Sequence, residues 1–382
     1  MTETISWIHF GDLHISGWDE QNYRDFLSLI DEANRYLSAG VAFALLPGDN
    51  ADDGEEDQYE LVRSAVLRSR FAIYAIAGDH DVAGGGLDLF RRYLSDSPYR
   101  SLKLGAYHFV FLNSVAKWQP PVFGLGPQQI AWLQDELTGA VRNGKQIVVF
   151  LHAYPSEHGS DANLLRECFL QSGVRLVEMG HTHYNELAND GQTIYAATRS
   201  TGQVEEGAPG FSVTTIDSGV VSWKFKPIGE WPLVMITSPA DQRLIIDPSS
   251  AAQVVRGPIQ VRARVWGEAI ENVTMSLDKG KAELMVKLDD CTWGREWAST
   301  ESIDGSHLIT VTAQSRGGQI ATDTVNMYSN QQGTYLVPTR RILDYENALG
   351  EWPEKHILGT QLGPNENGRH WPSRRKREHA AQ

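Results

Sequence analysis

The sequence has few cysteines, a shortage of positive charge and no long apolar run. Its two cysteines, Cys168 and Cys291, lie far apart, so we expect free thiols in a reducing compartment rather than a disulfide framework. Lys and Arg (34) are outnumbered by Asp and Glu (48), and the net charge of −14 argues against a broad basic surface for a long polyanion. No run is long enough to span a membrane, and the first residues lack the pattern of a signal peptide. We therefore expect a cytoplasmic protein without a membrane partner.

Five clusters of Asp and His punctuate the first half of the chain. They are Gly11-Asp12-Leu13-His14, Gly48-Asp49-Asn50, Gly78-Asp79-His80-Asp81, His152 and Gly180-His181-Thr182-His183. Seven of their side chains are candidate ligands: Asp12, His14, Asp49, Asp79, His152, His181 and His183. Such oxygen and imidazole donors suit a pair of divalent metal ions. Two adjacent metal ions can generate hydroxide near neutral pH and clamp a phosphoryl group.

Each cluster follows a short apolar run that is typical of a strand buried in an α/β sheet. These runs are residues 5–10, 41–46, 71–76, 146–151 and 174–179. Because open α/β sheets place their chemistry beyond the carboxyl ends of strands, we expect the five clusters to converge. Taken alone, a residue such as His152 is more often a turn or capping residue, so the metal hypothesis depends on the whole set.

The series resembles the motifs of the calcineurin-like metallophosphoesterases. The family pattern is Asp-x-His, Gly-Asp-x-x-Asp, Gly-Asn-His-Asp/Glu, then His, then Gly-His-x-His, and each element has a counterpart in residues 12–183. The chain looks most like the bacterial branch that includes cyclic-nucleotide phosphodiesterases and glycerophosphodiesterases. The resemblance implies a two-sheet α/β sandwich with two divalent metal ions, for which manganese, iron and zinc all fit the ligand types.

The resemblance also implies a role for each residue. The first metal would be held by Asp12, His14 and His183, the second by Asp79, His152 and His181, and Asp49 would bridge the two. His80 would lie over the phosphate as a catalytic residue and help the leaving group depart, and Asp81 would orient it. Asp52 would support a ligand or cap a helix.

One position departs from the family pattern. Asp79 stands where the family has Asn, and it brings a full charge in place of a neutral carbonyl oxygen. The carboxylates of Asp12, Asp49 and Asp79 then give about −3 against about +4 from two divalent metals. Asp79 should therefore tighten the second metal, or favour a trivalent one, and weaken the attraction for a highly charged monoester.

The apolar spacing predicts further elements and three parts of the chain. Helices are expected over residues 21–38, 57–70, 128–142 and 162–171, with strands over 193–197, 211–216 and 220–225. Beyond Pro239, short alternating segments (259–266, 273–277, 282–287, 297–299, 307–313 and 322–328) predict a smaller all-β sandwich that resembles immunoglobulin-like modules. We thus expect a phosphoesterase domain at 1–237, the sandwich at 238–331, and a C-terminal segment at 332–382.

The C-terminal segment is too apolar for a simple tail. It contains Trp352, Ile357, Leu358, Leu362 and Trp371. We expect it to pack on the body of the protein or on a second subunit, which leaves a homo-oligomer open. The basic run Arg374–Arg377 is interpreted as a solvated end rather than a nucleic-acid site.

These observations favour an enzyme that hydrolyses phosphate esters, first of all small phosphodiesters, by attack of a hydroxide that bridges the metals. The alternatives are a phosphomonoesterase, a nuclease, and a non-catalytic binding scaffold on the same fold. A nuclease would need a basic channel, and a scaffold would be expected to have lost ligands, whereas every ligand position is filled.

Overall fold

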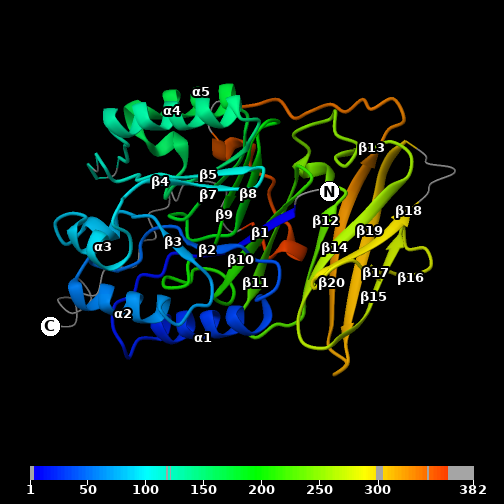
Figure 1. The fold of residues 1–382 in the computed structure, drawn as a ribbon, viewed down its shortest axis with the longest axis horizontal. Helices are drawn as coiled ribbons and strands as arrows, with labels where there is room; N and C mark the ends of the chain where they lie inside the picture. The colour runs from blue at the N-terminus through cyan, green and yellow to red at the C-terminus, as the bar shows by residue number, and fades with distance from the viewer. Residues whose placement is uncertain (1–3, 118, 121, 298–303, 342–343, 360–382) are drawn as a thin grey trace.

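The first 230 residues form four layers, with two stacked sheets between two pairs of helices (Figure 1). A computed structural model describes residues 4–117, 119–120, 122–297, 304–341 and 344–359. The helices that cover the outer faces are α1 (Gln21–Tyr36), α2 (Glu56–Val66), α4 (Pro127–Arg142) and α5 (Ala162–Ser172), and the short α3 (Asp88–Tyr93) lies at one end. Among the described residues, no helix has the length and apolar character needed to cross a membrane.

The first sheet has the order β11-β10-β1-β2-β3. Its strands are β1 (Thr4–Phe10), β2 (Phe43–Leu46), β3 (Ile73–Ala75), β10 (Gly210–Asp217) and β11 (Val220–Pro227). β1, β2 and β3 run parallel to one another. β10 pairs antiparallel with β1, and β11 pairs antiparallel with β10. Side chains of β1 alternate between two cores, since Trp7 faces the second sheet whereas Phe10 packs near Phe26 of α1. Burial of both faces explains the continuous apolar run in the sequence.

The second sheet has the order β4-β5-β6-β7-β9-β8. Its strands are β4 (Arg100–Leu104), β5 (Tyr107–Phe111), β6 (Gln146–Phe150), β7 (Val174–Met179), β8 (Glu186–Asn189) and β9 (Ile194–Ala197). A cluster of aromatic rings fills the space between the sheets, with Trp7 stacked on Phe43 and edge-on to Phe109 and Phe150. Leu133 and Leu137 of α4 seal the outer face. The α/β architecture expected from the sequence is therefore present.

The C-terminal half forms two further sheets around a separate core that includes Val261, Val273, Val311 and Met327. One sheet has the order β12-β14-β18-β17, and the other β13-β20-β19-β15-β16. The strands are β12 (Leu233–Ser238), β13 (Val254–Val255), β14 (Ile259–Trp266), β15 (Ile270–Leu277), β16 (Glu283–Leu284), β17 (Val286–Lys287), β18 (Thr292–Trp297), β19 (Gly305–Ser315) and β20 (Ile320–Ser329). The immunoglobulin-like character of this part stays a prediction.

Three features differ from the expectations. β12 pairs with β14, so the first of these sheets begins at Leu233, ahead of the expected division between residues 237 and 238. β18 ends at Trp297, where a strand was expected to start, and residues 298–299 lie outside the described residues. The short α3 and the strands β4, β5, β8 and β13 were not expected.

The two halves are joined by buried contacts. Trp266 and Met235 share the core beside α1, and Arg264 donates hydrogen bonds to Ser6 Oγ (2.6 Å) and to the Gly40 carbonyl (2.5 Å). Trp352 and Ile357 of the C-terminal segment enter the core between the two sheets of the first half. Leu362, Trp371 and the run Arg374–Arg377 lie outside the described residues.

Candidate metal centre

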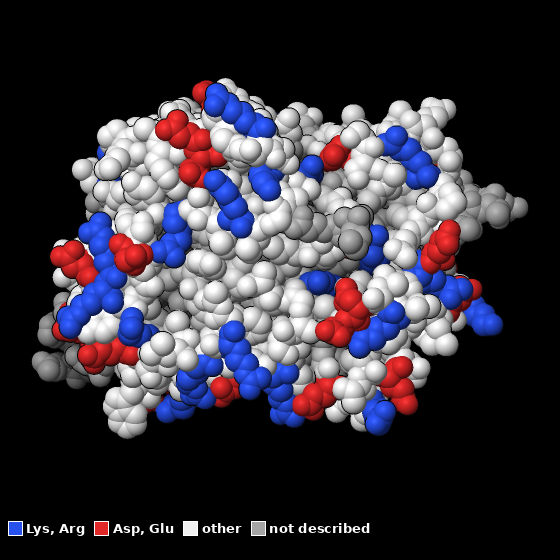
Figure 2. Space-filling model, in the orientation of Figure 1, with Lys and Arg blue, Asp and Glu red and all other residues white. Residues whose placement is uncertain are grey.

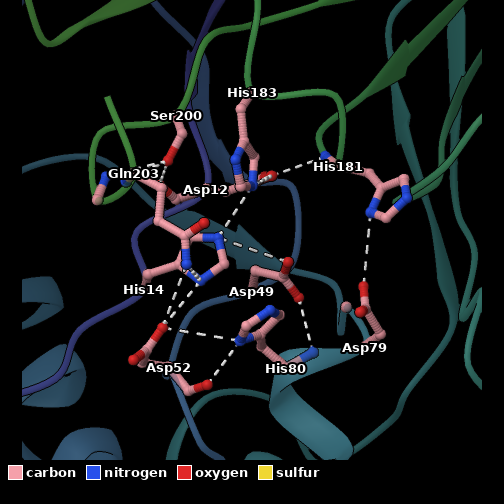
Figure 3. A network of polar contacts seen from close by, with 12 residues as sticks. Asp12, His14, Asp49, Asp52, Asp79, His80, His181, His183, Ser200 and Gln203 are labelled. Atoms are coloured by element: carbon pink, nitrogen blue, oxygen red, sulfur yellow. Dashed lines mark hydrogen bonds and ion pairs between the residues drawn. The ribbon is translucent and has the colours of Figure 1, made fainter. Parts of the chain in front are cut away.

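The seven candidate ligands come together at the carboxyl ends of strands from both sheets. Those after β1, β2 and β3 come from the first sheet, and those after β6 and β7 come from the second. The site is therefore built where two stacked sheets end together, not along a single sheet edge. In Figure 3, the aspartates and histidines of both sheets face a common space around Asp49.

The backbone at the site has an unusual conformation. His14, Asp49, His181 and His183 have φ values of 43°, 49°, 64° and 64°, in the left-handed region that residues other than glycine rarely adopt. Such strain persists only where the surrounding structure imposes it, and it tends to mark functional sites. Four of the seven candidate ligands share it, which makes a purely structural role for the set difficult to defend.

The glycines beside the ligands are required by close packing. A Cβ atom on Gly78 would lie 2.2 Å from Asp49 Oδ1, and one on Gly180 would lie 2.0 Å from Asp12 Oδ1. Any side chain at either position would displace a candidate ligand. The Gly-Asp and Gly-His pairs in the sequence are thus explained by the space that the carboxylates occupy.

The ligand atoms form two groups of four that share one carboxylate. The first is Asp12, His14, Asp49 and His183, and the second is Asp49, Asp79, His152 and His181. Within each group the ligand atoms lie within 4.8 Å of one another. Asp49 belongs to both groups, which is the arrangement expected for a carboxylate that bridges two cations.

In the first group, two imidazole nitrogens face each other. His14 Nε2 lies 3.1 Å from His183 Nε2, and His183 Nε2 lies 3.5 Å from Asp12 Oδ2. Burial lowers the pKa of His14 and of His183, so both rings are neutral near pH 7 and each has a lone pair to offer. Asp12 Oδ1 is buried and accepts no hydrogen bond from the described residues. A cation would satisfy these atoms, so the residues fit a metal ion.

In the second group, the carboxylates lie close to the imidazoles of His152 and His181. His152 Nε2 lies 3.2 Å from Asp79 Oδ1 and 3.4 Å from Asp49 Oδ2. Burial alone would raise the pKa of Asp79, but its contacts with His152 and His181 outweigh burial and hold that pKa well below its usual range. The Nδ1 atom of His152 lies 2.9 Å from the Pro47 carbonyl oxygen. Since only a protonated Nδ1 can donate to that oxygen, Nε2 is the atom that faces the site.

His80 lies beside both groups but belongs to neither. Its backbone N–H donates to Asp49 Oδ1 (2.9 Å), and its Nδ1 lies 2.6 Å from the Asp52 carbonyl oxygen. Burial favours the neutral ring, but the carboxylates of Asp49 and Asp79 outweigh it and raise the pKa of His80 to about 9. Cations bound at those carboxylates would reduce this attraction.

Asp81 was expected to orient His80, but its carboxylate hydrogen-bonds other groups among the described residues. Asp81 is buried and accepts hydrogen bonds from the backbone N–H groups of Asn50 and Gly78 and from the Tyr59 hydroxyl (2.8 Å). These bonds tie the loops after β2 and β3 together. The residue in contact with the His80 ring is Asp52, whose backbone oxygen lies 2.6 Å from His80 Nδ1 and whose carboxylate lies 3.2 Å from His14 Nδ1.

Two glutamates at the site were not expected from the sequence. Glu157 Oε1 lies 3.7 Å from His181 Nε2, and Glu205 Oε1 lies 3.6 Å from His183 Nδ1. In each case the other ring nitrogen faces the carboxylates of the site. A carboxylate behind a ligating imidazole fixes the ring and makes it a better donor. Neither glutamate stands in a motif, so only the folded chain reveals this pairing.

Two hollows flank the centre. A groove of about 1170 Å³ runs beside the second group, lined by Val82, Arg91, Tyr99 and Phe123 among others. The Phe123 ring stands edge-on to His181, with ring centroids 4.9 Å apart. A smaller hollow of about 230 Å³ opens beside the first group at His14, Asp52 and Gln203. The smaller hollow reaches the candidate ligand His14, whereas none of the seven candidate ligands lines the larger groove.

Comparison with known proteins agrees with the site. Residues 6–185 match the model of the calcineurin-like phosphoesterase family. Over these residues, just under half of the chain, the sequence is similar to that family. The match spans all seven candidate ligands, from Asp12 to His183, and leaves the C-terminal half outside.

The relatives have phosphoesterase names. A probable cyclic nucleotide phosphodiesterase of Moraxella catarrhalis is 28% identical over 183 residues, which cover 43% of this chain and 63% of the relative. A 3',5'-cyclic-nucleotide phosphodiesterase of Nostoc sp. is 26% identical over 197 residues, covering 47% and 71%. A dimetal phosphatase from Danio rerio is 11% identical, with a TM-score of 0.49, and covers 58% of this chain and 96% of that one. The chain thus spans less than two thirds of the first relative.

Proposed function

We propose that this protein is a dinuclear-metal-dependent phosphoesterase that acts on small phosphodiesters. The observation that carries the proposal is the division of seven ligand side chains into two groups that share Asp49. Two divalent metal ions in such a site supply a hydroxide near neutral pH and neutralise charge on phosphoryl oxygens. The family match and the names of the relatives support the same reaction class.

The chain's own residues have distinct roles in this proposal. Asp12, His14 and His183 hold one metal, Asp79, His152 and His181 hold the other, and Asp49 contacts both. His80 stands beside the centre with its Nδ1–H committed to the Asp52 carbonyl, and because its pKa is raised to about 9 the ring also carries a proton on Nε2, which it gives to the leaving oxygen. Manganese, iron and zinc are all compatible with these ligands.

Two features favour a diester over a monoester. The hollow at His14 and the groove beside Phe123 offer two places near the centre for the organic groups of a diester. Asp79 adds a negative charge next to the phosphate, and this charge disfavours a dianionic monoester more than a monoanionic diester. A small substrate is also favoured, because Lys and Arg side chains are interspersed with Asp and Glu on the face drawn in Figure 2, with no continuous basic track for a nucleic acid.

The deciding experiment is a substrate panel with several added metals. It should include cyclic nucleotides, glycerophosphodiesters, simple monoesters and single-stranded DNA, each with manganese, iron and zinc. We expect the highest kcat/KM on a small diester. We expect no turnover of any substrate after the metals are removed by a chelator. Metal binding without turnover on any ester would favour the scaffold alternative, and preferential cleavage of DNA would favour a nuclease.

A further inference from the structure

A further cavity, apart from the two hollows beside the metal centre, lies at the junction of the three parts of the chain. It has a volume of about 360 Å³ and lies between β11, the segment that leads into β12, the start of β20, and His356 of the C-terminal segment. None of its lining residues belongs to the candidate metal centre. Its size is within the usual range of small-molecule sites.

The cavity contains a buried ammonium without an anionic partner. Lys226 is 2% exposed, and its Nζ donates to the Pro227 carbonyl (2.5 Å) and lies 4.4 Å from the centre of the Trp231 ring. Among the described residues, no carboxylate oxygen lies within 4.0 Å of this Nζ. Burial lowers the pKa of Lys226 to about 8, so the side chain is still mostly charged at pH 7. A buried charge is costly unless an opposite charge accompanies it.

A second lysine in the cavity wall shares its counter-charge. Lys224 Nζ lies 3.1 Å from Asp323 Oδ1, and Lys355 Nζ lies 2.8 Å from the same oxygen. Asp323 is therefore one carboxylate between two buried ammonium groups, and it also accepts a hydrogen bond from the Ile236 N–H. Three buried lysines thus have one buried carboxylate among them.

The nearby acids do not remove this imbalance. The Glu32 carboxylate accepts hydrogen bonds from the Trp231 indole N–H and the Gly229 backbone N–H, both at 2.8 Å. Glu230 lines the cavity but is exposed to solvent, which screens its charge. In a chain with a net charge of −14, this buried excess of positive charge is unusual.

We propose that the cavity binds a small anion of the phosphate class, with Lys226 and Lys224 as its charged contacts. Lysine ammonium groups act as point charges and suit a tetrahedral oxyanion, whereas a planar carboxylate would be matched by the fork of an arginine. The cavity is larger than a bare phosphate needs, so a phosphate monoester with a small organic group is also admitted.

Binding there would bridge β11 to the C-terminal β-sheets. Lys224 and Lys226 both belong to β11, and Lys224 Nζ also contacts Thr322 O (2.9 Å) and Asp323 of β20. Because Ile320, Ala321 and Thr322 of β20 also line the cavity, an anion held there by the two lysines would lie against both parts and stabilise the folded chain by mass action.

The test uses the full-length, metal-loaded protein with sodium sulfate, inorganic phosphate and a non-cyclic phosphate monoester as separate probes. Sodium chloride at matched ionic strength is the reference. Isothermal titration calorimetry should detect sulfate binding to the wild-type protein and to Lys281→Met, which removes an exposed lysine. Lys226→Met should weaken that binding about tenfold or more, the factor expected for one charge-assisted contact.

A second variant protects the test against misfolding of Lys226→Met. Glu230→Gln removes an exposed carboxylate at the cavity and should tighten sulfate binding, in the opposite direction to the lysine variant. Tighter binding of the monoester than of inorganic phosphate would identify an organic phosphate as the ligand, and equal binding would identify the free ion. If sulfate affinity is the same in wild type, Lys226→Met and Glu230→Gln, the anion binds elsewhere and the proposal is overturned.

Discussion

The backbone oxygen of Asp52 lies 2.6 Å from Nδ1 of His80, and the carboxylate of the same residue lies 3.2 Å from Nδ1 of His14. A carbonyl oxygen and a carboxylate can only accept, so both histidines carry a proton on Nδ1 and direct Nε2 toward the centre. Asp52 thereby sets the tautomer of a candidate metal ligand and of the candidate proton donor.

Asp52→Asn should therefore damage the first metal site, because it removes the carboxylate behind His14 and keeps the backbone oxygen that contacts His80. We expect metal affinity at that site to fall about 10- to 100-fold, the usual effect of losing a partner behind a ligand. Titration of metal-free protein with manganese, with occupancy measured by elemental analysis, checks this. Asp53→Asn is the matched control, because Asp53 is buried beside Gln58 and contacts neither histidine. Unchanged metal affinity in Asp52→Asn would show that His14 needs no support.

His80→Ala should keep both metals and slow turnover by about 10²-fold or more, which is the usual contribution of general acid catalysis. The reason is that His80 lies outside both ligand groups but contacts Asp49 through its backbone N–H, which the substitution preserves. Steady-state kinetics and metal content should be measured on the same preparation. Loss of a metal from this variant would make His80 a ligand and refute its assignment as a proton donor.

Glu157→Gln and Glu205→Gln should separate the two metal sites. Glu157 stands behind His181 of the second group, whereas Glu205 stands behind His183 of the first. Each substitution should weaken one metal about tenfold and leave the other nearly unchanged. Two-site calorimetric titration with manganese distinguishes the steps, and each variant serves as the control for the other. If both variants weaken the same step, the glutamates do not act through their separate histidines.

The candidate ligands could be predicted from the sequence because each is marked by residues next to it in the chain. Gly-Asp and Gly-His follow apolar runs directly, and the glycines are required because a Cβ at Gly78 or Gly180 would strike a neighbouring carboxylate. Burial of β1 on both faces gives the continuous run that predicts a strand ahead of Asp12.

The residues that sequence reasoning missed depend on contacts between distant segments. Glu157 reaches His181 from the loop after β6, and no spacing rule connects them. Asp81 was assigned to its neighbour His80, yet its carboxylate turns to Asn50 and Tyr59 of other segments. The prolines near Leu233 suggested a boundary after β12, but pairing with β14 decides which sheet that strand joins.

His158 predicts how stability changes with pH. It is fully buried, and burial lowers its pKa from 6.5 to about 4 although its Nδ1 contacts the Tyr154 carbonyl oxygen. The unfolded chain then binds more protons than the folded chain between about pH 4 and pH 6.5, so the free energy of unfolding should rise with pH across this window. The full effect of one such group is about 3 kcal/mol.

His158→Asn tests this assignment, because an amide can keep the hydrogen bond to Tyr154 and does not titrate. Urea unfolding at saturating metal should show a shallower rise between pH 4 and pH 6.5 in the variant. The difference between the two proteins is the informative quantity, since metal ligands titrate in both. Parallel curves would mean that His158 has an ordinary pKa in the folded protein.

Asp79→Asn would restore the amide of the family pattern. Asp79 contacts His152 and His181 in the second group, and its charge should tighten the metal there. The variant should therefore lose the second metal more readily on dilution. With one negative charge fewer beside the phosphate, it should also turn over monoesters better relative to diesters.

The comparison must be made at saturating metal, so that a difference in occupancy is not mistaken for a difference in specificity. The ratio of kcat/KM for a monoester to that for a diester with the same leaving group is the quantity to measure. Asp81→Asn is the control, since Asp81 is a buried carboxylate nearby that hydrogen-bonds Asn50 and Tyr59 and is in neither ligand group. We expect the ratio to rise in Asp79→Asn and not in Asp81→Asn, because only Asp79 is among the ligands. An unchanged ratio with both sites full would mean that the charge of Asp79 is neutralised by its two histidines and never reaches the substrate.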